Sequence, residues 1–384
     1  MPMVDWTARQ ISDPLSRLRF LKAAAPVWQP APERKRLRWR LAGIGLVAVL
    51  LVLTAVRFVD GRSVKASADL TARAPRASAG NLILPAVSPR QQATSRVWLV
   101  EKSAAYEIYS NGLRVENRFA TQNHPRSYVA FAVDGSGAGE SGSSPVGIVF
   151  HTTESLQAPF EPEQNRELTK VGEDLLGYVK RKKAYNFVID RFGRVFRVVK
   201  EEDAAEHAGY SVWATQKSIY LNLNESFAGV AVETRTEPGQ ISASVTPAQI
   251  RAIGILTEML RAQFTIPAEN CVTHAQVSVN PTRMLAGYHM DWGSSFPFEA
   301  VGLPDNYARP LPSIALFGFQ YDPAFTRAAG PRLSQAAGLA EAELGKRAEA
   351  AGLSVAALRK SLERRYREHL AAVRYASISH EAVS

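Results

Sequence analysis

The chain has 384 residues, of which 46% are hydrophobic, so it is long enough for one sizeable domain with appended segments. Its formal net charge of +10 comes from the two ends: residues 1–40 hold nine lysines and arginines against three acidic residues, and residues 327–384 hold ten against six. Because the central part is formally neutral, the charge pattern excludes the basic groove that duplex nucleic acid requires. The single cysteine, Cys271, excludes an intramolecular disulfide and a cysteine-rich metal knuckle.

Residues 41–59 are predicted to form a transmembrane anchor. Leu41 to Val56 is apolar apart from Thr54, and apolar neighbours extend this run towards the roughly 20 residues that a helix needs to cross a bilayer. The basic tail 1–40 precedes it directly, so the positive-inside rule predicts a cytoplasmic N-terminus, with the rest of the chain across the membrane. A cleaved signal peptide is the alternative, but its n-region of about 40 residues would be unusually long.

Two segments of different character follow the anchor. Residues 60–94 are rich in alanine, serine, proline and arginine and contain few large apolar side chains, which predicts a disordered linker. Residues 95–145 are predicted to form a small β-rich lead-in. Apolar residues alternate there around Asn111-Gly112, a dipeptide that tight hairpin turns prefer.

Residues 146–311 carry the patterns of the main domain. The short apolar run 146–150 predicts a buried central strand with His151 at its C-terminal end. Thr246 and Gln249 form a capping-box pattern with proline at the first helical position, which predicts the start of a helix. Strands that alternate with helices predict an α/β domain with a mixed central β-sheet flanked by helices. The further patterns predict a helix, a β-hairpin, a strand and a second helix, over about 168–179, 185–199, 229–234 and 247–264.

Residues 312–384 are predicted to form a helical C-terminal extension. Two helices are expected, over about 333–350 and 354–374, separated at Gly352-Leu353. Apolar side chains recur every four residues in the second one, which predicts a helical hairpin that packs on the domain or on a second copy or partner. The alternative is a basic surface that meets an anionic cell-wall polymer or a membrane. Those apolar residues are Leu358, Leu362, Tyr366 and Leu370.

Four of the seven histidines are candidates for chemistry. Catalytic zinc is commonly held by three protein ligands drawn from histidine and carboxylate. His124, His369 and His380 lie in a polar loop or in the tail, where a surface position is expected. The candidates are His151 after the central strand, His207 in the segment EHAGYS, and His274 and His289, which share residues 271–298 with Asp291.

Several motifs in this order resemble the type 2 N-acetylmuramoyl-L-alanine amidases, a family that includes phage-lysozyme-type amidases and peptidoglycan recognition proteins. The resemblance covers about residues 146–300. The motifs are His151-Thr152-Thr153, the hairpin YNFVIDRFGRVFRV, the segment AEHAGYSVW, the run from Asn224-Glu225-Ser226 to Glu233, the TPAQ helix, and H-x-Q-x-S-x-N-P-x-R with the later D-W-G and F-P-F.

The resemblance implies a Zn²⁺ site held by His151, His274 and Asp291. The family's third ligand lies in a D-P-G-like segment, which here reads Asp291-Trp292-Gly293 without the proline. His289 stands two residues earlier, so it is an alternative third ligand. The implied reaction is hydrolysis of the amide between the lactyl group of N-acetylmuramic acid and L-alanine of the stem peptide, with zinc activating water.

Glu233 and Tyr185 match the catalytic residues of two branches of the family, and either is a candidate proton-transfer group. His289 occupies the position of a lysine or arginine that stabilises the oxyanion. Because an imidazolium would do this better than a neutral ring, we expect activity to rise on mild acidification. The residues expected to line the substrate groove are His207, Trp213, Asn224 and Arg283.

The resulting expectation is a zinc-dependent peptidoglycan amidase in the bacterial inner membrane. Its N-terminus would be cytoplasmic, its single helix at residues 41–59 would anchor it, and its catalytic domain would be periplasmic. The alternative is a protein of the same fold that binds muropeptides without cleaving them. A structural scaffold held by the anchor and the C-terminal helices is a third hypothesis.

Overall fold

The computed structural model describes residues 96–135 and 139–381, with side-chain placement in the last helix up to residue 374. The predicted segments 1–40, 41–59 and 60–94 lie outside the described residues, so the membrane anchor stays a prediction. Within the described ranges, no helix is long and apolar enough to cross a bilayer.

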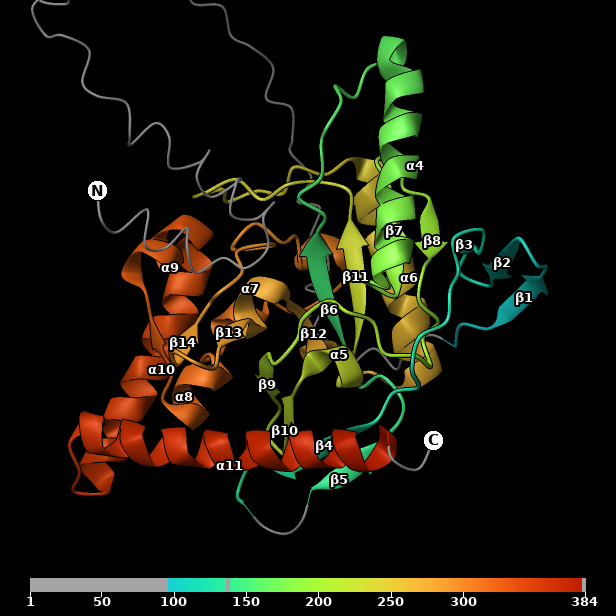
Figure 1. The fold of residues 1–384 in the computed structure, drawn as a ribbon. Coiled ribbons are helices and arrows are strands. Elements are labelled where there is room, and N and C mark those ends of the chain that lie inside the picture. Colours follow the sequence, from blue (N-terminus) through green and yellow to red (C-terminus); the bar gives the residue numbers. More distant parts are fainter. Residues whose placement is uncertain (1–95, 136–138, 382–384) are drawn as a thin grey trace, which may run out of the picture. The chain divides into compact units, whose positions relative to one another are not determined.

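A central β-sheet of eight strands organises the domain (Figure 1). Its strand order is β1-β2-β3-β8-β7-β11-β6-β12. Strands β7, β11, β6 and β12 are parallel, whereas β1–β2, β2–β3 and β7–β8 pair in the antiparallel sense. The predicted α/β class with a mixed sheet is therefore confirmed. The strands are β1 Leu99–Lys102, β2 Tyr106–Tyr109, β3 Arg114–Glu116, β6 Gly147–Thr152, β7 Phe187–Ile189, β8 Val195–Arg197, β11 Phe227–Val232 and β12 Cys271–Thr273.

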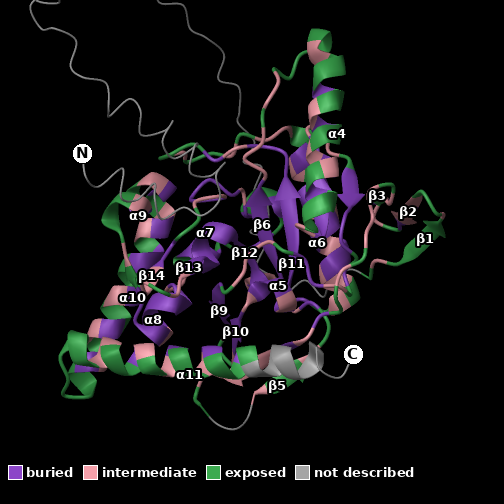
Figure 2. Cartoon of the chain, in the orientation of Figure 1, coloured by how far each residue is buried: buried purple, intermediate pink, exposed green. Residues whose placement is uncertain are grey.

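Strand β6 lies between β11 and β12 and is buried along its whole length, as Figure 2 shows. Successive residues of a strand point to opposite faces of the sheet. Phe150 points to the face that helix α6 (Pro247–Phe264) covers, where it shares a hydrophobic cluster with Leu256. On the opposite face, helix α4 (Asn165–Lys182) packs through Leu176 against Ala231. The strand that carries His151 is thus held from both sides.

The local patterns of the main domain predict its elements well. Helix α4 includes the predicted 168–179, and strands β7 and β8 form the predicted hairpin. Helix α6 begins at Pro247 behind a complete capping box: the Thr246 hydroxyl accepts a hydrogen bond from Gln249 N, and the Gln249 side chain accepts one from Thr246 N.

The predicted lead-in is integrated into the sheets of the domain. Strands β2 and β3 form the predicted hairpin, and Gly112 in its turn has φ +82°, which favours glycine. Strand β3 pairs with β8, so the first three strands extend the central sheet. The next two strands join a second sheet of order β5-β4-β10-β9. These strands are β4 Tyr128–Ala132, β5 Glu140–Gly142, β9 Val212–Ala214 and β10 Ser218–Leu221.

The C-terminal helices pack on the domain. The predicted pair appears as α10 (Pro331–Ala350) and α11 (Val355–Glu381), separated by residues 351–354. Tyr366 of α11 is buried, with its ring centroid 5.3 Å from that of Phe317 and 4.8 Å from that of Phe319. This contact favours packing on the domain, and self-association stays a prediction. The pattern did not predict the short elements α5 Leu223–Ser226, α7 His274–Val277, α8 Pro312–Phe317, α9 Pro323–Ala329, β13 Val279–Asn280, β14 Leu285–Ala286 and β15 Gln320–Tyr321.

Truncation of Phe150 tests the central position of β6. Its side chain is fully buried and its ring stacks on that of Phe296 at 4.5 Å. Phe150→Ala is expected to lower the free energy of unfolding by about 3–5 kcal/mol, because it leaves a cavity in the core. Trp98→Ala is the control: this aromatic side chain is 59% exposed, and its loss is expected to cost no more than about 0.5 kcal/mol. Urea denaturation of both variants measures the difference, and equal losses would contradict this description of the core.

Candidate functional site

Three side chains meet at the C-terminal ends of two neighbouring parallel strands. His151 is the fifth residue of β6, and His274 follows β12 directly as the first residue of α7. Because Thr273 pairs with Phe150 across the two strands, the histidines that follow each of them are brought side by side. Asp291 comes from the loop after β14. One ligating atom from each residue lies within 4.8 Å of the others, and no other group of this kind occurs among the described residues.

Both histidines turn the same ring nitrogen towards the carboxylate. Nδ1 of His151 lies 2.9 Å from Oδ2 of Asp291, and Nδ1 of His274 lies 2.8 Å from Oδ1 and 3.0 Å from Oδ2. Burial alone would raise the pKa of Asp291, but the charge of His274 and the close ring nitrogens of both histidines hold it well below its ordinary value. Burial lowers the pKa of His151 to about 4. At neutral pH the site therefore combines an ionised carboxylate with a neutral imidazole at His151.

This donor set fits a zinc ion. Two histidines and one carboxylate are a recurrent shell for hydrolytic zinc, which keeps its fourth position for water. The Asp291 side chain is only 12% exposed, and an ionised carboxylate that has lost most of its hydration is stabilised by a nearby positive charge. The three residues are the ligands that the resemblance implies, so they could hold such an ion.

The loop of Asp291 is fixed on both sides. The backbone carbonyl oxygen of Asp291 accepts a hydrogen bond from Ala275 N at 3.2 Å. On the other side, Trp292 N donates to the Thr236 hydroxyl at 3.0 Å, and the Tyr307 hydroxyl donates to the carbonyl oxygen of Trp292 at 3.0 Å. Sequence reasoning missed Thr236 and Tyr307, because nothing in their local sequence shows that they reach a loop distant in the chain.

The backbone at Trp292 explains the missing proline. Its φ is +50°, in the left-handed region, whereas the proline ring fixes φ near −65°. The buried indole packs edge-on against Phe296, with ring centroids 5.1 Å apart. This chain therefore holds Asp291 with a turn that proline cannot adopt.

His289 lies beside His274 and makes no hydrogen bond to Asp291. One face of its ring stacks on His274, with centroids 4.7 Å apart and planes 16° apart, while the residue as a whole is exposed. Desolvation, and then the charge of His274, lower the pKa of His289 below its ordinary value. Its imidazolium therefore forms less readily than that of a free histidine. The expected rise of activity on mild acidification stays a prediction.

Glu233 lies on the same face of the sheet as His151. Ala231 pairs with His151 across β11 and β6, and Glu233 follows Ala231 by two residues, about 7 Å further along the strand direction. Its side chain is buried, and Oε2 accepts a hydrogen bond from Arg191 N at 3.2 Å. Burial raises the pKa of Glu233 to about 7. A carboxyl group with such a pKa can both accept and release a proton at neutral pH.

Tyr185, the other candidate for proton transfer, packs against His151. Its ring centroid lies 5.0 Å from that of His151, and its φ is +60°. Tyr185 therefore borders the cluster directly, whereas Glu233 lies just beyond the C-terminal end of β11.

The residues predicted to line a groove have different positions. His207 contacts His151, with 3.1 Å between Nδ1 of His207 and Nε2 of His151. Arg283 is half-buried in the turn between β13 and β14, and its backbone N donates to the Asn280 side chain at 3.1 Å. The groove positions predicted for Trp213 and Asn224 need correction. Trp213 is buried in a hydrophobic cluster and donates through Nε1 to Asn270 at 3.0 Å. The Asn224 side chain is used within the protein, because it accepts hydrogen bonds from the backbone N–H groups of residues 207–209.

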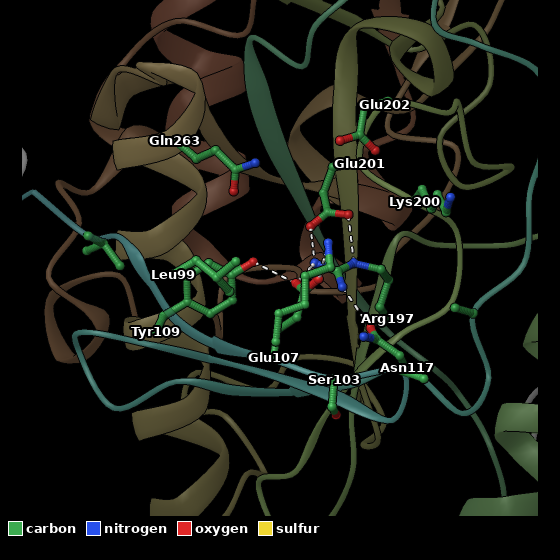
Figure 3. Close-up of a pocket in the computed structure, with 14 residues that line it drawn as sticks. Leu99, Ser103, Glu107, Tyr109, Asn117, Arg197, Lys200, Glu201, Glu202 and Gln263 are labelled. Atoms are coloured by element: carbon green, nitrogen blue, oxygen red, sulfur yellow. Dashed lines mark hydrogen bonds and ion pairs between the residues drawn. The ribbon is translucent and has the colours of Figure 1, made fainter.

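A cavity of about 590 Å³ lies elsewhere in the domain (Figure 3). Arg197 lies at its centre and pairs with Glu201 at 2.7 Å and with Glu107 at 2.9 Å. The Tyr109 hydroxyl donates to Glu107 at 2.9 Å. These buried charges satisfy one another, and the cavity shares no residue with the His151 cluster, so it belongs to the packing of β1–β3 on the sheet.

Comparison with known proteins bears on the domain that holds this site. Residues 141–286 match the profile of a family described as N-acetylmuramoyl-L-alanine amidase. The chain is 32% identical over 114 residues to N-acetylmuramoyl-L-alanine amidase AmiD of Escherichia coli (strain K12), a match that covers 28% of this chain and 37% of that protein. The chain thus spans little more than a third of this curated relative.

Two solved structures are similar at lower identity. One is the complex of the amidase AmiD from E. coli with the substrate anhydro-N-acetylmuramic acid-L-Ala-D-gamma-Glu-L-Lys: 21% identity, TM-score 0.32, covering 64% of this chain and 98% of that one. The other is AmpDh3 from Pseudomonas aeruginosa in complex with anhydromuramic pentapeptide: 21% identity, TM-score 0.31, covering 41% and 58%. The family match contains His151, Glu233 and His274 and ends before Asp291. Residues 141–286 are therefore similar to the type 2 N-acetylmuramoyl-L-alanine amidase family.

Proposed function

We propose that this protein is a zinc-dependent peptidoglycan amidase that hydrolyses the amide bond between the lactyl group of N-acetylmuramic acid and L-alanine of the stem peptide. Similarity to the amidase family supports the substrate class. The observation that carries the proposal is the convergence of His151, His274 and Asp291, whose ligating atoms lie within 4.8 Å of one another.

The residues around this cluster have distinct proposed roles. Nδ1 of His151, Nδ1 of His274 and the Asp291 carboxylate would hold zinc, which supplies Lewis-acid activation of water and of the scissile carbonyl. Glu233 takes the proton of the attacking water and passes it to the leaving amine, for which a pKa of about 7 is suitable. His289 donates one N–H hydrogen bond to the negative charge that develops on the carbonyl oxygen.

The place of action is also a proposal. A peptidoglycan substrate lies outside the cytoplasmic membrane, and the apolar run at 41–59 behind a basic tail supports a single-pass anchor with a cytoplasmic N-terminus. The catalytic domain would then work in the periplasm of a bacterium, with residues 60–94 as its tether.

Zinc content and cleavage test the proposed function. The purified full-length chain is expected to bind one zinc ion and to release stem peptides from isolated sacculi. His151→Ala is expected to lose both properties, because one of three ligands is gone. His124→Ala is the matched control, since this side chain is 52% exposed and should be dispensable for both properties. Stoichiometric zinc without cleavage would favour the muropeptide-binding alternative, and absence of zinc from the unmodified chain would overturn the proposal.

The pH dependence of cleavage tests the role of Glu233. Because a general base must be deprotonated, kcat/KM is expected to rise as pH increases through about 7, where this carboxyl loses its proton. Glu233→Gln should lower kcat by roughly 10²–10⁴-fold at pH 8 and remove this rise. Tyr185→Phe is measured beside it. Full activity of Glu233→Gln together with loss of activity in Tyr185→Phe would transfer the role to the tyrosine.

Glu233→Gln, which should lower activity, is expected to stabilise the folded protein. The pKa of Glu233 is raised in the folded protein, from 4.5 to about 7, so folding becomes less favourable as pH rises across that interval. In the metal-free protein, Glu233→Gln is therefore expected to increase the free energy of unfolding relative to wild type by up to ~3 kcal/mol at pH 8, and by much less at pH 4.5. Urea denaturation at both pH values measures this, with the exposed Glu237→Gln as control. An equal effect at the two pH values would contradict the buried, protonated state.

A further inference from the structure

We propose that His207 is a positioning residue, which fixes the tautomer and ring orientation of His151 so that Nδ1 of His151 presents an unshared electron pair at the metal position. This inference rests on the proposed function, since it concerns the same zinc site. It assigns His207 a role within the protein in place of the groove contact that its sequence suggested.

A chain of hydrogen bonds starts at a backbone carbonyl. Nε2 of His207 lies 3.1 Å from the carbonyl oxygen of Phe227, and this oxygen can only accept, so Nε2 carries the proton. In a neutral His207, Nδ1 is then an acceptor. It lies 3.1 Å from Nε2 of His151, which must therefore be the donor. The proton of His151 is thus placed on Nε2.

The consequence falls on the other nitrogen of His151. With its proton on Nε2, a neutral His151 has an unshared pair on Nδ1, which faces Oδ2 of the ionised Asp291 at 2.9 Å. Two acceptors at this distance repel each other unless a cation lies between them. The arrangement therefore favours a metal ion at this place, and outer partners of a ligating histidine are known to fix its tautomer in this way.

Arg126 holds the carbonyl group that His207 contacts. Its guanidinium is 2% exposed and donates through one terminal nitrogen to the same Phe227 carbonyl at 2.9 Å. Its other hydrogen bonds go to the carbonyl oxygens of residues 201, 224 and 225 and to the Asn186 side chain, so no carboxylate directly neutralises it. The carbonyl that accepts the hydrogen bond from His207 is thus also fixed by a second buried donor.

The position of the His207 ring is determined by its surroundings. Oδ1 of Asn224 accepts hydrogen bonds from three successive backbone N–H groups, at 2.9 Å from His207, 2.7 Å from Ala208 and 2.8 Å from Gly209. The ring lies over Gly229, where an added Cβ would be 2.6 Å from Cγ of His207. Both ring nitrogens are occupied by protein atoms, so neither is left to bind a substrate.

Zinc affinity of His207 variants tests the proposal with a readout other than activity. The dissociation constant of zinc is measured for the full-length protein by competition with a chromophoric chelator. His207→Ala is expected to raise this constant about 10–100-fold. His207→Gln should recover most of the affinity, because the amide oxygen of glutamine can accept the hydrogen bond from His151. In zinc-saturated enzyme, kcat should fall in His207→Ala while KM for muropeptide changes little.

A second pair of variants leaves His207 itself in place. Gly229→Ala should displace the imidazole ring and weaken zinc binding in the same direction. Gly338→Ala, at a helical position where an added Cβ meets no atom within 4 Å, is the matched control and should bind zinc like wild type. The comparison of Gly229→Ala with Gly338→Ala tests the positioning role of His207 even if His207→Ala fails to fold.

The outcomes separate this inference from the proposed function. Zinc bound equally well by wild type, His207→Ala and Gly229→Ala would overturn the positioning role and leave the amidase proposal standing. A raised KM with unchanged zinc affinity would return His207 to the substrate groove. Failure of the wild-type chain to bind zinc would overturn both.

Discussion

The structure depends on one constraint: an ionised carboxylate, Asp291, is held at the end of the central sheet with only 12% of its side chain exposed. Loss of hydration is costly for a charge of this kind, and it is tolerated only where opposite charge or hydrogen bonds compensate. Here the compensation comes from two imidazoles at the ends of adjacent parallel strands, and from the cation that we propose between them. The adjacency of β6 and β12, which sets the two histidines side by side, is therefore the basis of the site.

The supporting contacts come from parts of the chain that are distant in sequence. Thr236 and Tyr307 hold the backbone after Asp291, and Asn224 and Arg126 hold the turn and the carbonyl that orient His207. Each contact is a hydrogen bond between groups with little access to solvent, where an unpaired donor or acceptor would cost more than at the surface. The geometry of the site thus depends on hydrogen bonds from several segments that are far apart in the sequence.

Local patterns were sufficient for most elements, whereas the three residues of the His151 cluster were named by the family resemblance. The capping box at Thr246 and the buried run before His151 depend on interactions within a few residues, so the sequence alone could indicate them. Positions such as Trp213 could not be assigned in this way, because a tryptophan in a groove and one in a core look alike until the packing is known. Similarly, the presence of Trp292 where the family has proline could be explained only once the left-handed φ of Trp292 was known. Pairing of β3 with β8 is non-local and has no pattern of its own.

The sheet also shows that the folding unit extends beyond the segment shared with the family. That segment begins at residue 141, whereas β1, β2 and β3 and the buried Arg126 all precede it. A fragment cut at this homology boundary would expose the backbone of β8 as an open edge, a geometry that promotes intermolecular strand pairing. It would also leave four backbone carbonyls beneath the site without their common donor. The minimal folding unit is therefore defined by strand pairing and by one buried guanidinium, and it must include the strands from Leu99 onward.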